Sequence, residues 1–361
     1  MKRSIKKTSI KDIAQEASVS ISTVSHVINK TKYVTDNTKE RVSKAIKKLN
    51  YRPDIIARSL RTKSTRTIGV LLPDISQPFF AQVVKGIEEA SRIRNYTLIM
   101  GCTFYDIDEE ERQMNSMLDQ SIDGLMFFCG YDTYEHIKRV YDSNVPIVVL
   151  DRELSDNEIP SVLIDNVLAM EKAVQHLYDI GHREIGYITF PYENQTTIRR
   201  RYEGYCRALR KNKLPYNPDF VIIDDQLRLD ELKGTYAAIK KKIEEQKIPT
   251  AIITLADFLA LGAMKALKEF GYRIPEDISV MGFNNEIICA FSDPTLTTVK
   301  QPKKLMGETA ANLLLDIIEG KKIENKNIIL QTEIIERSST EPPGKIKAFI
   351  KKNKLSLERS L

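Results

Sequence analysis

The amino-acid sequence predicts an α/β protein with an all-helical N-terminal domain and a body of two doubly wound parallel sheets. Its 361 residues exceed what one hydrophobic core usually holds. Residues 1–66 contain 17 Lys and Arg against 5 Asp and Glu, whereas the remainder has a net charge of −6. From residue 67 onward, continuous apolar runs alternate with amphipathic helical patterns, which is typical of parallel sheets covered on both faces.

The N-terminal domain, residues 1–52, has the pattern of three short helices. The first begins at Ser9, the second follows Ser20 and the third begins at about Asp36. Each repeats apolar residues at helical spacing. Two short helices joined by a tight turn and braced by a third form a helix-turn-helix unit.

The composition of the second helix favours DNA as the partner. A helix that enters the major groove must come close to base edges, and basic side chains around it contact phosphates. Small or hydrogen-bonding residues form the outer N-terminal face of this helix: Ile21, Ser22, Ser25 and His26. The alternative is a three-helix protein-interaction domain with an incidental basic face.

Residues 53–66 read as a hinge helix and linker. Pro53 is well placed to begin a helix, but the stretch to Leu60 is only about two turns, too short to be stable alone in water. Leu60 is apolar and lies among Arg58, Arg61 and Lys63. Such a side chain suits insertion between base steps of the minor groove, although it is also suited to packing the linker onto the body.

The body contains two series of strand and helix patterns, which indicates two lobes. Ligands of this fold bind beyond the carboxyl ends of the strands. The residues that follow predicted strands are therefore candidates for a cleft: Phe79, Phe80, Asp151, Arg152, Asp165, Thr197 to Arg201, Asp257 and Asn284. For the aspartates the alternative is a helix cap or turn, and for the Phe pair it is the core.

The stretch "IKDIAQEASVSISTVSHVINKTKYVTDNTKERV" and the segment up to "TIGVLLPDI" resemble the LacI family of bacterial repressors. "TVSHVINKT" is most similar to the purine and ribose repressor branch. The resemblance extends to about Thr340 and implies a body of the periplasmic-binding-protein fold, residues 67–340. We expect lobe 1 to comprise about 67–165 plus 295–322, and lobe 2 about 166–294 plus 323–340.

The resemblance implies a homodimer on a near-palindromic, double-stranded DNA operator. It implies Ser22 and His26 as base readers, Lys32 as a nearby base or phosphate contact, and Leu60 as the minor-groove wedge. The full set of expected DNA contacts is Ser22, Thr23, Ser25, His26, Asn29, Lys32, Tyr33, Ala57 and Leu60.

The resemblance also implies a small-molecule effector between the lobes: a sugar, sugar acid, phosphosugar or nucleobase. The expected pocket residues are Phe79, Phe80, Asp165, Thr197, Arg201, Asp257 and Asn284. Asn284 stands where the family motif usually has an aspartate, and an amide both donates and accepts hydrogen bonds. With Arg199, Arg200 and Arg201 adjacent, we hypothesise an acidic effector.

Other functional classes find little support in the sequence. It has no G-x-G-x-x-G after a strand, no P-loop and no G-x-S-x-G elbow, so we expect neither enzyme activity, a cofactor nor a metal. It also lacks a membrane-span pattern and a signal peptide, and its four cysteines are scattered, so we expect a cytoplasmic protein with free thiols.

Two alternative functions remain open. The protein is alternatively a catabolite-control-type regulator with a protein corepressor, or a sugar-binding protein without a DNA role.

Residues 341–361 form a basic tail after a Pro-Pro-Gly break, and we expect this tail to add weak DNA affinity without changing assembly size.

Overall fold

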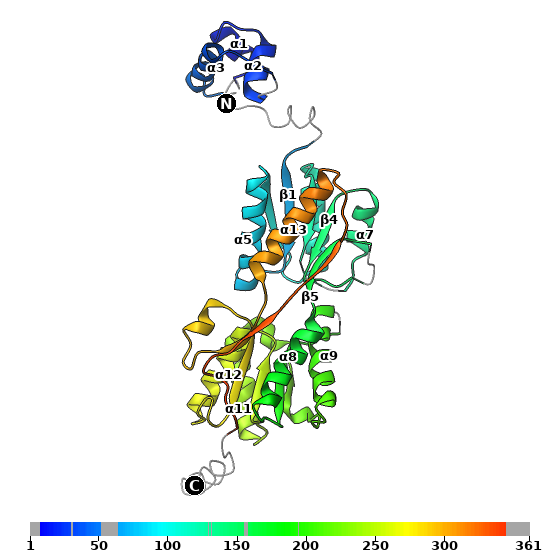
Figure 1. Ribbon diagram of the computed structural model, residues 1–361, viewed down its shortest axis with the longest axis vertical. Coiled ribbons are helices and arrows are strands. Elements are labelled where there is room, and N and C mark those ends of the chain that lie inside the picture. Colours follow the sequence, from blue (N-terminus) through cyan, green and yellow to red (C-terminus); the bar gives the residue numbers. More distant parts are fainter. Residues whose placement is uncertain are drawn as a thin grey trace, which may run out of the picture. The chain divides into compact units, whose positions relative to one another are not determined.

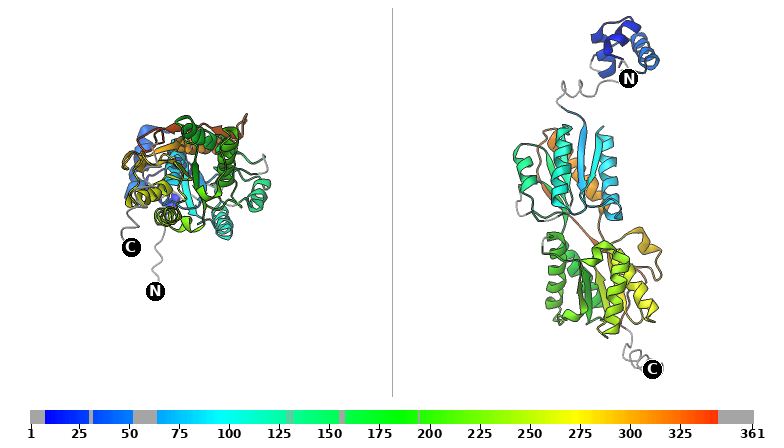
Figure 2. Two further views of the ribbon diagram at one scale, coloured as in Figure 1. Left: turned by 90° about the horizontal axis from the view of Figure 1, so that it is seen from below. Right: turned by 180° about the vertical axis from the view of Figure 1, so that it is seen from behind.

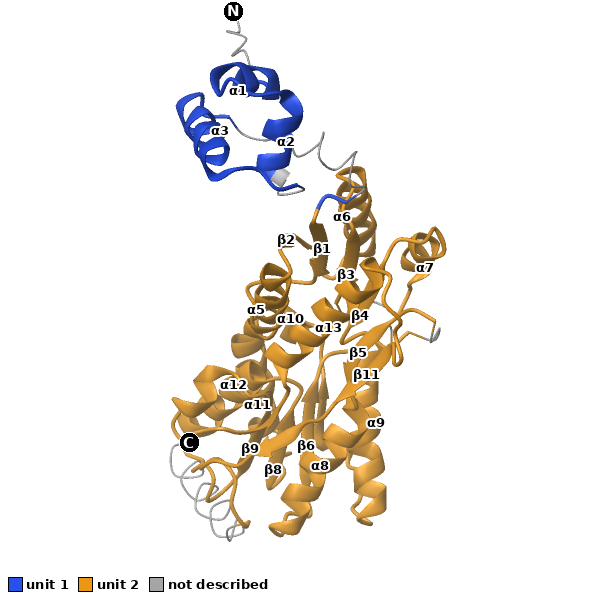
Figure 3. Ribbon diagram, turned by 45° about the horizontal axis from the view of Figure 1, so that its top comes forward, with its two compact units in different colours: residues 1–65 blue, residues 66–361 orange. Residues whose placement is uncertain are grey.

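The computed structural model describes residues 8–29, 32–51, 64–128, 130, 132–154, 158–193 and 195–343. The chain divides into two compact units, residues 1–65 and residues 66–361 (Figure 3). The predictions for Ala57 and Leu60, for the hinge helix and for the basic tail beyond residue 343 lie outside the described residues. No helix in the described ranges is both long and apolar enough to cross a membrane.

The first unit is the predicted bundle of three helices, α1 (Ile10–Glu16), α2 (Ile21–Asn29) and α3 (Asp36–Lys48). Ser9 begins α1 through a capping box, in which Ser9 and Asp12 satisfy each other's backbone N–H groups. Ser20 begins α2, because its Oγ accepts a hydrogen bond from the Thr23 N–H at 3.1 Å. The helices enclose a small apolar core of Ile13, Ala14, Ala17, Val24, Val42 and Ala45.

The second unit has two lobes, each a six-stranded sheet between helices (Figures 1 and 2). In lobe 1 the sheet has the order β11-β5-β4-β3-β1-β2, and every pair is parallel. Its strands are β1 (Thr67–Leu72), β2 (Thr97–Cys102), β3 (Gly124–Phe127), β4 (Ile147–Leu150), β5 (Ser161–Ile164) and β11 (Asn327–Leu330). Its helices are α5 (Pro78–Ile93), α6 (Ile107–Asp119), α7 (Glu135–Asp142) and α13 (Lys303–Ile318).

In lobe 2 the sheet has the order β12-β10-β9-β8-β6-β7, parallel except for the pair of β10 and β12. Its strands are β6 (Ile185–Thr189), β7 (Val221–Ile223), β8 (Ala251–Thr254), β9 (Ser279–Asn284), β10 (Thr297–Lys300) and β12 (Glu333–Ile335). Its helices are α8 (Asn166–Asp179), α9 (Thr196–Lys211), α10 (Gln226–Leu229), α11 (Glu231–Glu244) and α12 (Asp257–Glu269), with the short 3₁₀ turns η1 (Pro218–Phe220) and η2 (Ile287–Ala290).

The core of lobe 1 explains its continuous apolar strands. Val70 packs in the cluster formed with α5 and α13, whereas its neighbour Leu71 packs in the cluster formed with α6 and α7. Successive residues of a strand point to opposite faces, so a strand covered on both faces must be apolar throughout. On the first face, α5 and α13 cross at Gly86 and Gly307, where the backbones approach too closely for any side chain.

Within the described residues, the chain passes between the lobes after β5, after β10 and after β11. This corrects two of the expected lobe boundaries. β10 belongs to the lobe 2 sheet although segment 295–322 was expected in lobe 1, and β11 belongs to the lobe 1 sheet although segment 323–340 was expected in lobe 2. Both strands are short edge or near-edge strands, and their sheet membership is set by pairing with strands far away in the sequence.

Candidate nucleic-acid interface and ligand cavity

The outer N-terminal turn of α2 is accessible and presents one apolar side chain, Ile21, beside polar ones. Val24 is fully buried in the core of the first unit, whereas Ser22 is exposed and Ile21 is 44% exposed. Of the other predicted DNA contacts, Thr23, Ser25 and His26 are half-buried on α2, Asn29 ends the helix, and Lys32 and Tyr33 are exposed in the loop after it. This surface combines hydroxyls, an imidazole, an ammonium group and a phenol.

Arg41 on α3 has a structural task that the sequence did not reveal. Its guanidinium donates hydrogen bonds to the backbone carbonyls of Ala17 and Ser18, in the turn between α1 and α2. Lys48 on the same helix forms a 2.7 Å ion pair with Glu16 at the end of α1. Both side chains therefore hold α3 against α1 and the turn.

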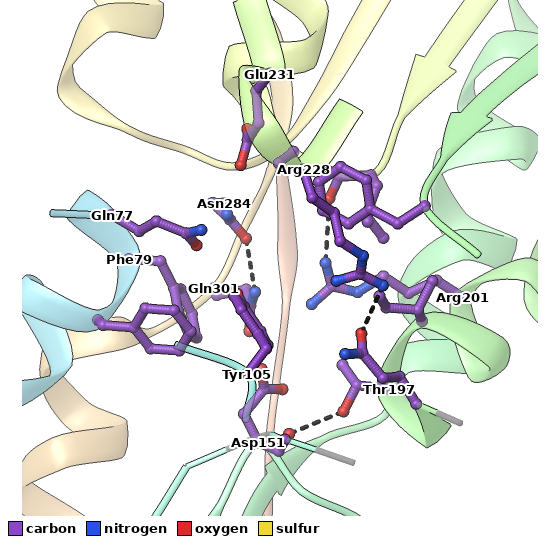
Figure 4. Close-up of a pocket in the computed structure, with 17 residues that line it drawn as sticks. Gln77, Phe79, Tyr105, Asp151, Thr197, Arg201, Arg228, Glu231, Asn284 and Gln301 are labelled. Atoms are coloured by element: carbon purple, nitrogen blue, oxygen red, sulfur yellow. Dashed lines mark hydrogen bonds between the residues drawn. The ribbon is translucent and has the colours of Figure 1, made fainter. Parts of the chain in front are cut away.

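A cavity lies between the lobes, at the carboxyl ends of the strands of both sheets (Figure 4). The space outside the protein atoms amounts to about 610 Å³, and this figure includes the part that is open to solvent. Lobe 1 contributes Gln77, Phe79, Phe80, Tyr105, Gly130 and Asp151. Lobe 2 and the crossover after β10 contribute Phe190, Gln195, Thr197, Ile198, Arg201, Arg228, Glu231, Leu255, Ala256, Asn284 and Gln301.

Five of the seven predicted pocket residues line this cavity: Phe79, Phe80, Thr197, Arg201 and Asn284. Arg201 is 6% exposed. Its Nε donates to Asn166 Oδ1 at 2.8 Å, its Nη1 donates to the Leu255 carbonyl at 3.1 Å, and its guanidinium lies 3.9 Å from the centre of the Phe283 ring. These contacts fix a permanently charged group in the wall of the cavity.

Asn284 ends β9 with a φ of 110° and faces Gln301, which follows β10. The Gln301 Nε2 donates to Asn284 Oδ1 at 2.7 Å, so Asn284 uses its carbonyl oxygen within the protein and keeps its amide hydrogens. Gln301 is 2% exposed, and its Oε1 accepts no hydrogen bond within the described part of the chain. A buried amide oxygen of this kind needs a donor, which a bound molecule can supply.

Arg228 on α10 and Glu231 at the start of α11 were not anticipated. Arg228 Nε donates to Asp225 at 3.0 Å, its Nη2 donates to the Pro191 carbonyl at 3.1 Å and to Gln195 Oε1 at 3.0 Å, and the guanidinium lies 4.6 Å from the Phe190 ring centre. Both residues follow β7, so the rule that ligands bind beyond strand ends would have found them.

Two predicted residues, Asp165 and Asp257, do not line the cavity. Asp165 is exposed and caps α8, because its Oδ1 accepts from the Leu168 N–H at 2.8 Å. Asp257 is fully buried at the start of α12, where it accepts from Thr298 Oγ1 at 2.6 Å and from the Glu286 N–H at 2.7 Å. Burial raises the pKa of Asp257 to about 6.

Arg199 and Arg200 also point elsewhere, although they precede Arg201 on α9. Arg199 Nη1 pairs with Asp132 at 2.9 Å, and Arg200 forms a two-pronged pair with Glu153 at 2.6 and 3.0 Å. Asp132 and Glu153 belong to loops of lobe 1, so these pairs bridge the lobes. The three arginines therefore do not form one cluster in the cavity.

Two family models match the chain. Residues 9–54 match the model described as bacterial regulatory proteins, lacI family, and residues 174–340 match the periplasmic binding protein-like domain. The first match covers the three-helix unit, and the second covers most of lobe 2 with the crossovers to lobe 1.

Curated relatives match along almost their whole length. The HTH-type transcriptional regulator RegA of Clostridium saccharobutylicum is 34% identical over 92% of this chain and 99% of its own. The repressor PurR of Aliivibrio salmonicida (strain LFI1238) is 35% identical over 91% and 98%, and catabolite control protein A of Priestia megaterium is 35% identical over 92% and 98%.

Solved structures agree in fold. The lac repressor dimer bound to operator and the anti-inducer ONPF superposes with a TM-score of 0.82 at 26% identity, over 93% of this chain and 100% of the repressor chain. The complex of the transcriptional regulator CelR with cellobiose gives 0.69 at 27% identity, over 92% and 100%. The helix-turn-helix unit, the two-lobed body and the near full-length similarity to regulators agree, and the chain therefore belongs to the lacI family of bacterial regulatory proteins, as a DNA-binding transcriptional regulator.

Proposed function

We propose that the protein binds a near-palindromic DNA operator as a homodimer and represses transcription there. The outer face of α2 enters the major groove, where Ser22 and His26 contact base edges. Thr23, Ser25, Asn29, Lys32 and Tyr33 contribute further contacts to bases or phosphates, and Ala57 and Leu60 of the hinge contact the minor groove. A dimer on a palindrome places one such unit on each half-site.

The operator affinity is controlled by a small molecule bound in the interlobe cavity. The observation that supports this most is the origin of the lining, which comes from both lobes, so that a bound molecule contacts both at once. A ligand changes an equilibrium between two lobe arrangements only as far as it binds them with different affinity, and contacts to both lobes provide that difference. We assign no catalytic step to the cavity and place the protein in the cytoplasm, with the DNA.

Selection from random DNA duplexes with the full-length protein tests the DNA role. The expected result is enrichment of a near-palindromic site, with binding that weakens steeply as salt increases. Replacing Ser22 with Ala is expected to weaken binding to the selected site by a factor of about 5 to 100 and to relax base preference at one position of each half-site. The matched control is Ser116→Ala, the same chemical change at an exposed position of α6. Recovery of no duplex above random competitor would refute the proposal.

The regulation is tested separately, because a protein corepressor is the competing mechanism. Ligands that raise the melting temperature of the purified protein are added to the selected operator, and the Kd for DNA is measured. A small molecule alone is expected to change this Kd. If bound ligands leave it unchanged while a protein partner alters it, the corepressor mechanism replaces the effector mechanism.

A further inference from the structure

We propose that the molecule bound in the interlobe cavity carries a carboxylate or phosphate group held by Arg228, together with hydroxyl groups held at Asn284 and Gln301. This inference rests on the proposed function, since it names the chemical class of the effector. It replaces the reasoning from three adjacent arginines, two of which point to lobe 1 instead. Arg228 carries the inference.

Arg228 is a built-in cation of the cavity wall. Its Nε forms an ion pair with the exposed carboxylate of Asp225 at 3.0 Å, and its Nη2 donates to the Pro191 carbonyl and to Gln195 Oε1. The guanidinium lies against the Phe190 ring and 5.7 Å from the Tyr105 ring centre. The side chain is 21% exposed. Its Nη1 makes no hydrogen bond to any residue that the structure describes, which leaves donors of a fixed, planar, permanently charged group available to a ligand. A guanidinium of this kind suits carboxylate and phosphate oxygens.

Arg201 lies on the same side of the cavity as Arg228, across from Gln77 and Phe79 (Figure 4). Two of its hydrogen bonds go to an amide oxygen and to a backbone carbonyl. Two guanidinium groups in one half-buried wall create a positive potential, and low-dielectric surroundings strengthen its effect on an anion.

The carboxyl of Glu231 reduces this positive potential less than a fully ionised glutamate would. Burial, with the neighbouring charges of Asp257 and Glu286, raises the pKa of Glu231 to about 7 against the lowering effect of Arg228. Its Oε2 is buried and accepts no hydrogen bond within the described residues. Below pH 7 the protonated group is a neutral donor, so an anion beside Arg228 is not repelled. Asp151 remains as the acidic group at the other end of the lining.

The remaining polar groups indicate hydroxyls on the same ligand. The Gln301 Oε1 is buried and lacks a donor, while Asn284 keeps its amide hydrogens for an acceptor. A hydroxyl both donates and accepts, so one or two hydroxyls satisfy this pair. Phe79 and Phe80 add an apolar surface for the carbon skeleton. The class is therefore a hydroxylated acid or a sugar phosphate.

Direct binding to the full-length protein tests the class with matched probes. Glucose, gluconate and glucose 6-phosphate form one set, ribose and ribose 5-phosphate a second, and inorganic phosphate stands alone. Calorimetry and thermal shift at pH 6 are expected to show at least one acid or phosphate bound about tenfold or more tightly than its neutral counterpart. The affinities for gluconate and for glucose 6-phosphate are compared to decide whether the bound group is a carboxylate or a phosphate.

Two variants locate the anion. Arg228→Gln is expected to weaken binding of the anionic probe by about tenfold or more. The control is Arg183→Gln, which removes the same charge from a guanidinium that stacks on Tyr178 outside the cavity. It is expected to leave binding of the probe unchanged. Affinity is expected to fall as pH rises through 7, where Glu231 ionises, and Glu231→Gln is expected to remove that fall.

Three results would overturn the inference: a neutral probe that binds as tightly as its acid, no binding by any anionic probe, or equal binding to Arg228→Gln and the parent. The proposed function fails by other observations, namely no specific DNA site or no effect of a bound ligand on DNA affinity. If a neutral sugar binds and alters operator affinity, the inference of an anionic ligand is refuted, whereas the proposed regulation by a small molecule is supported.

Discussion

Removal of the Asp132 carboxylate is expected to open the two lobes. Asp132 lies in lobe 1, in the loop after β3, and caps the beginning of α9 in lobe 2. Its Oδ1 accepts from the Thr196 N–H and from Thr196 Oγ1, each at 2.6 Å, and its Oδ2 pairs with Arg199 at 2.9 Å. The residue that precedes α9, Gln195, makes no capping hydrogen bond with its side chain. One helix end is therefore satisfied from the opposite lobe.

The magnitude follows from the two kinds of contact that Asp132→Ala removes. Loss of a helix cap costs about 1 kcal/mol. Loss of the partly exposed ion pair between Asp132 and Arg199 costs about 0.5 kcal/mol more. The sum is about 1.5 kcal/mol, which changes the ratio of closed to open molecules by a factor of about 10. The Arg200–Glu153 pair and the hydrogen bond from Thr197 Oγ1 to the Asp151 carbonyl remain, so the variant weakens closure without abolishing it.

Double electron–electron resonance between one label on the exposed part of α7 and one at Lys211, the last residue of α9, measures lobe separation directly. The labels are attached without cysteine chemistry, because the chain has four cysteines. Asp132→Ala is expected to add a population at longer distance. Asp106→Ala is the matched control, since Asp106 caps α6 within lobe 1 through the N–H groups of Asp108 and Glu109.

A distance distribution for Asp132→Ala that matches the parent would refute the reasoning, as would equal opening in Asp106→Ala. High salt offers an independent check on the parent protein. It screens the half-exposed pairs of Arg199 and Arg200, so the longer distance is expected to gain population as salt increases, even without a substitution.

Three further substitutions test the local arguments. Ser20→Ala removes the acceptor for the Thr23 N–H and is expected to destabilise the helix-turn-helix unit by about 1 kcal/mol, measured by thermal unfolding followed by circular dichroism. Gly86→Ala places a Cβ 2.2 Å from the Lys304 carbonyl oxygen and is expected to cost lobe 1 about 1–3 kcal/mol in urea unfolding. Burial lowers the pKa of His182 to about 4, so the unfolded chain binds a proton between pH 6.5 and 4 that the folded chain does not, and stability is expected to fall as pH decreases through that window. His182→Gln is expected to flatten this dependence.

The elements and part of the cavity lining were predictable because they depend on local pattern and on one general rule. Helical spacing predicted the three N-terminal helices, and apolar runs predicted the strands that follow residue 67. The rule that ligands bind beyond strand ends then selected Phe79, Thr197, Arg201 and Asn284, all of which line the cavity. Each of these residues follows a strand that can be recognised from its own apolar run, without knowledge of the strands that it pairs with.

Contacts between distant segments were not predictable in the same way. Gln301 lines the cavity only because β10 pairs with β9, so that the chain leaves lobe 2 beside Asn284. The sequence of a four-residue strand such as β10 does not reveal which sheet the strand joins. Asp257 follows a strand like the other candidates, but its carboxylate is used inside lobe 2 to hold Thr298 and the Glu286 N–H. The position of strand ends predicts where a site lies, whereas the direction of each side chain decides whether that residue lines it.

Helix α9 shows how direction links the cavity to lobe closure. Thr197 and Arg201 are four residues apart and therefore lie on one face of the helix, which lines the cavity. Arg199 and Arg200 lie three and four residues after Thr196 on the adjoining face, which is bound to acidic side chains of lobe 1. Any ligand that shifts or rotates α9 to improve its contacts with the first face must also lengthen or shorten the ion pairs of the second. Binding energy in the cavity is thus expressed as a change in lobe closure, and Asp132→Ala is expected to alter ligand affinity although it contributes no atom to the cavity lining.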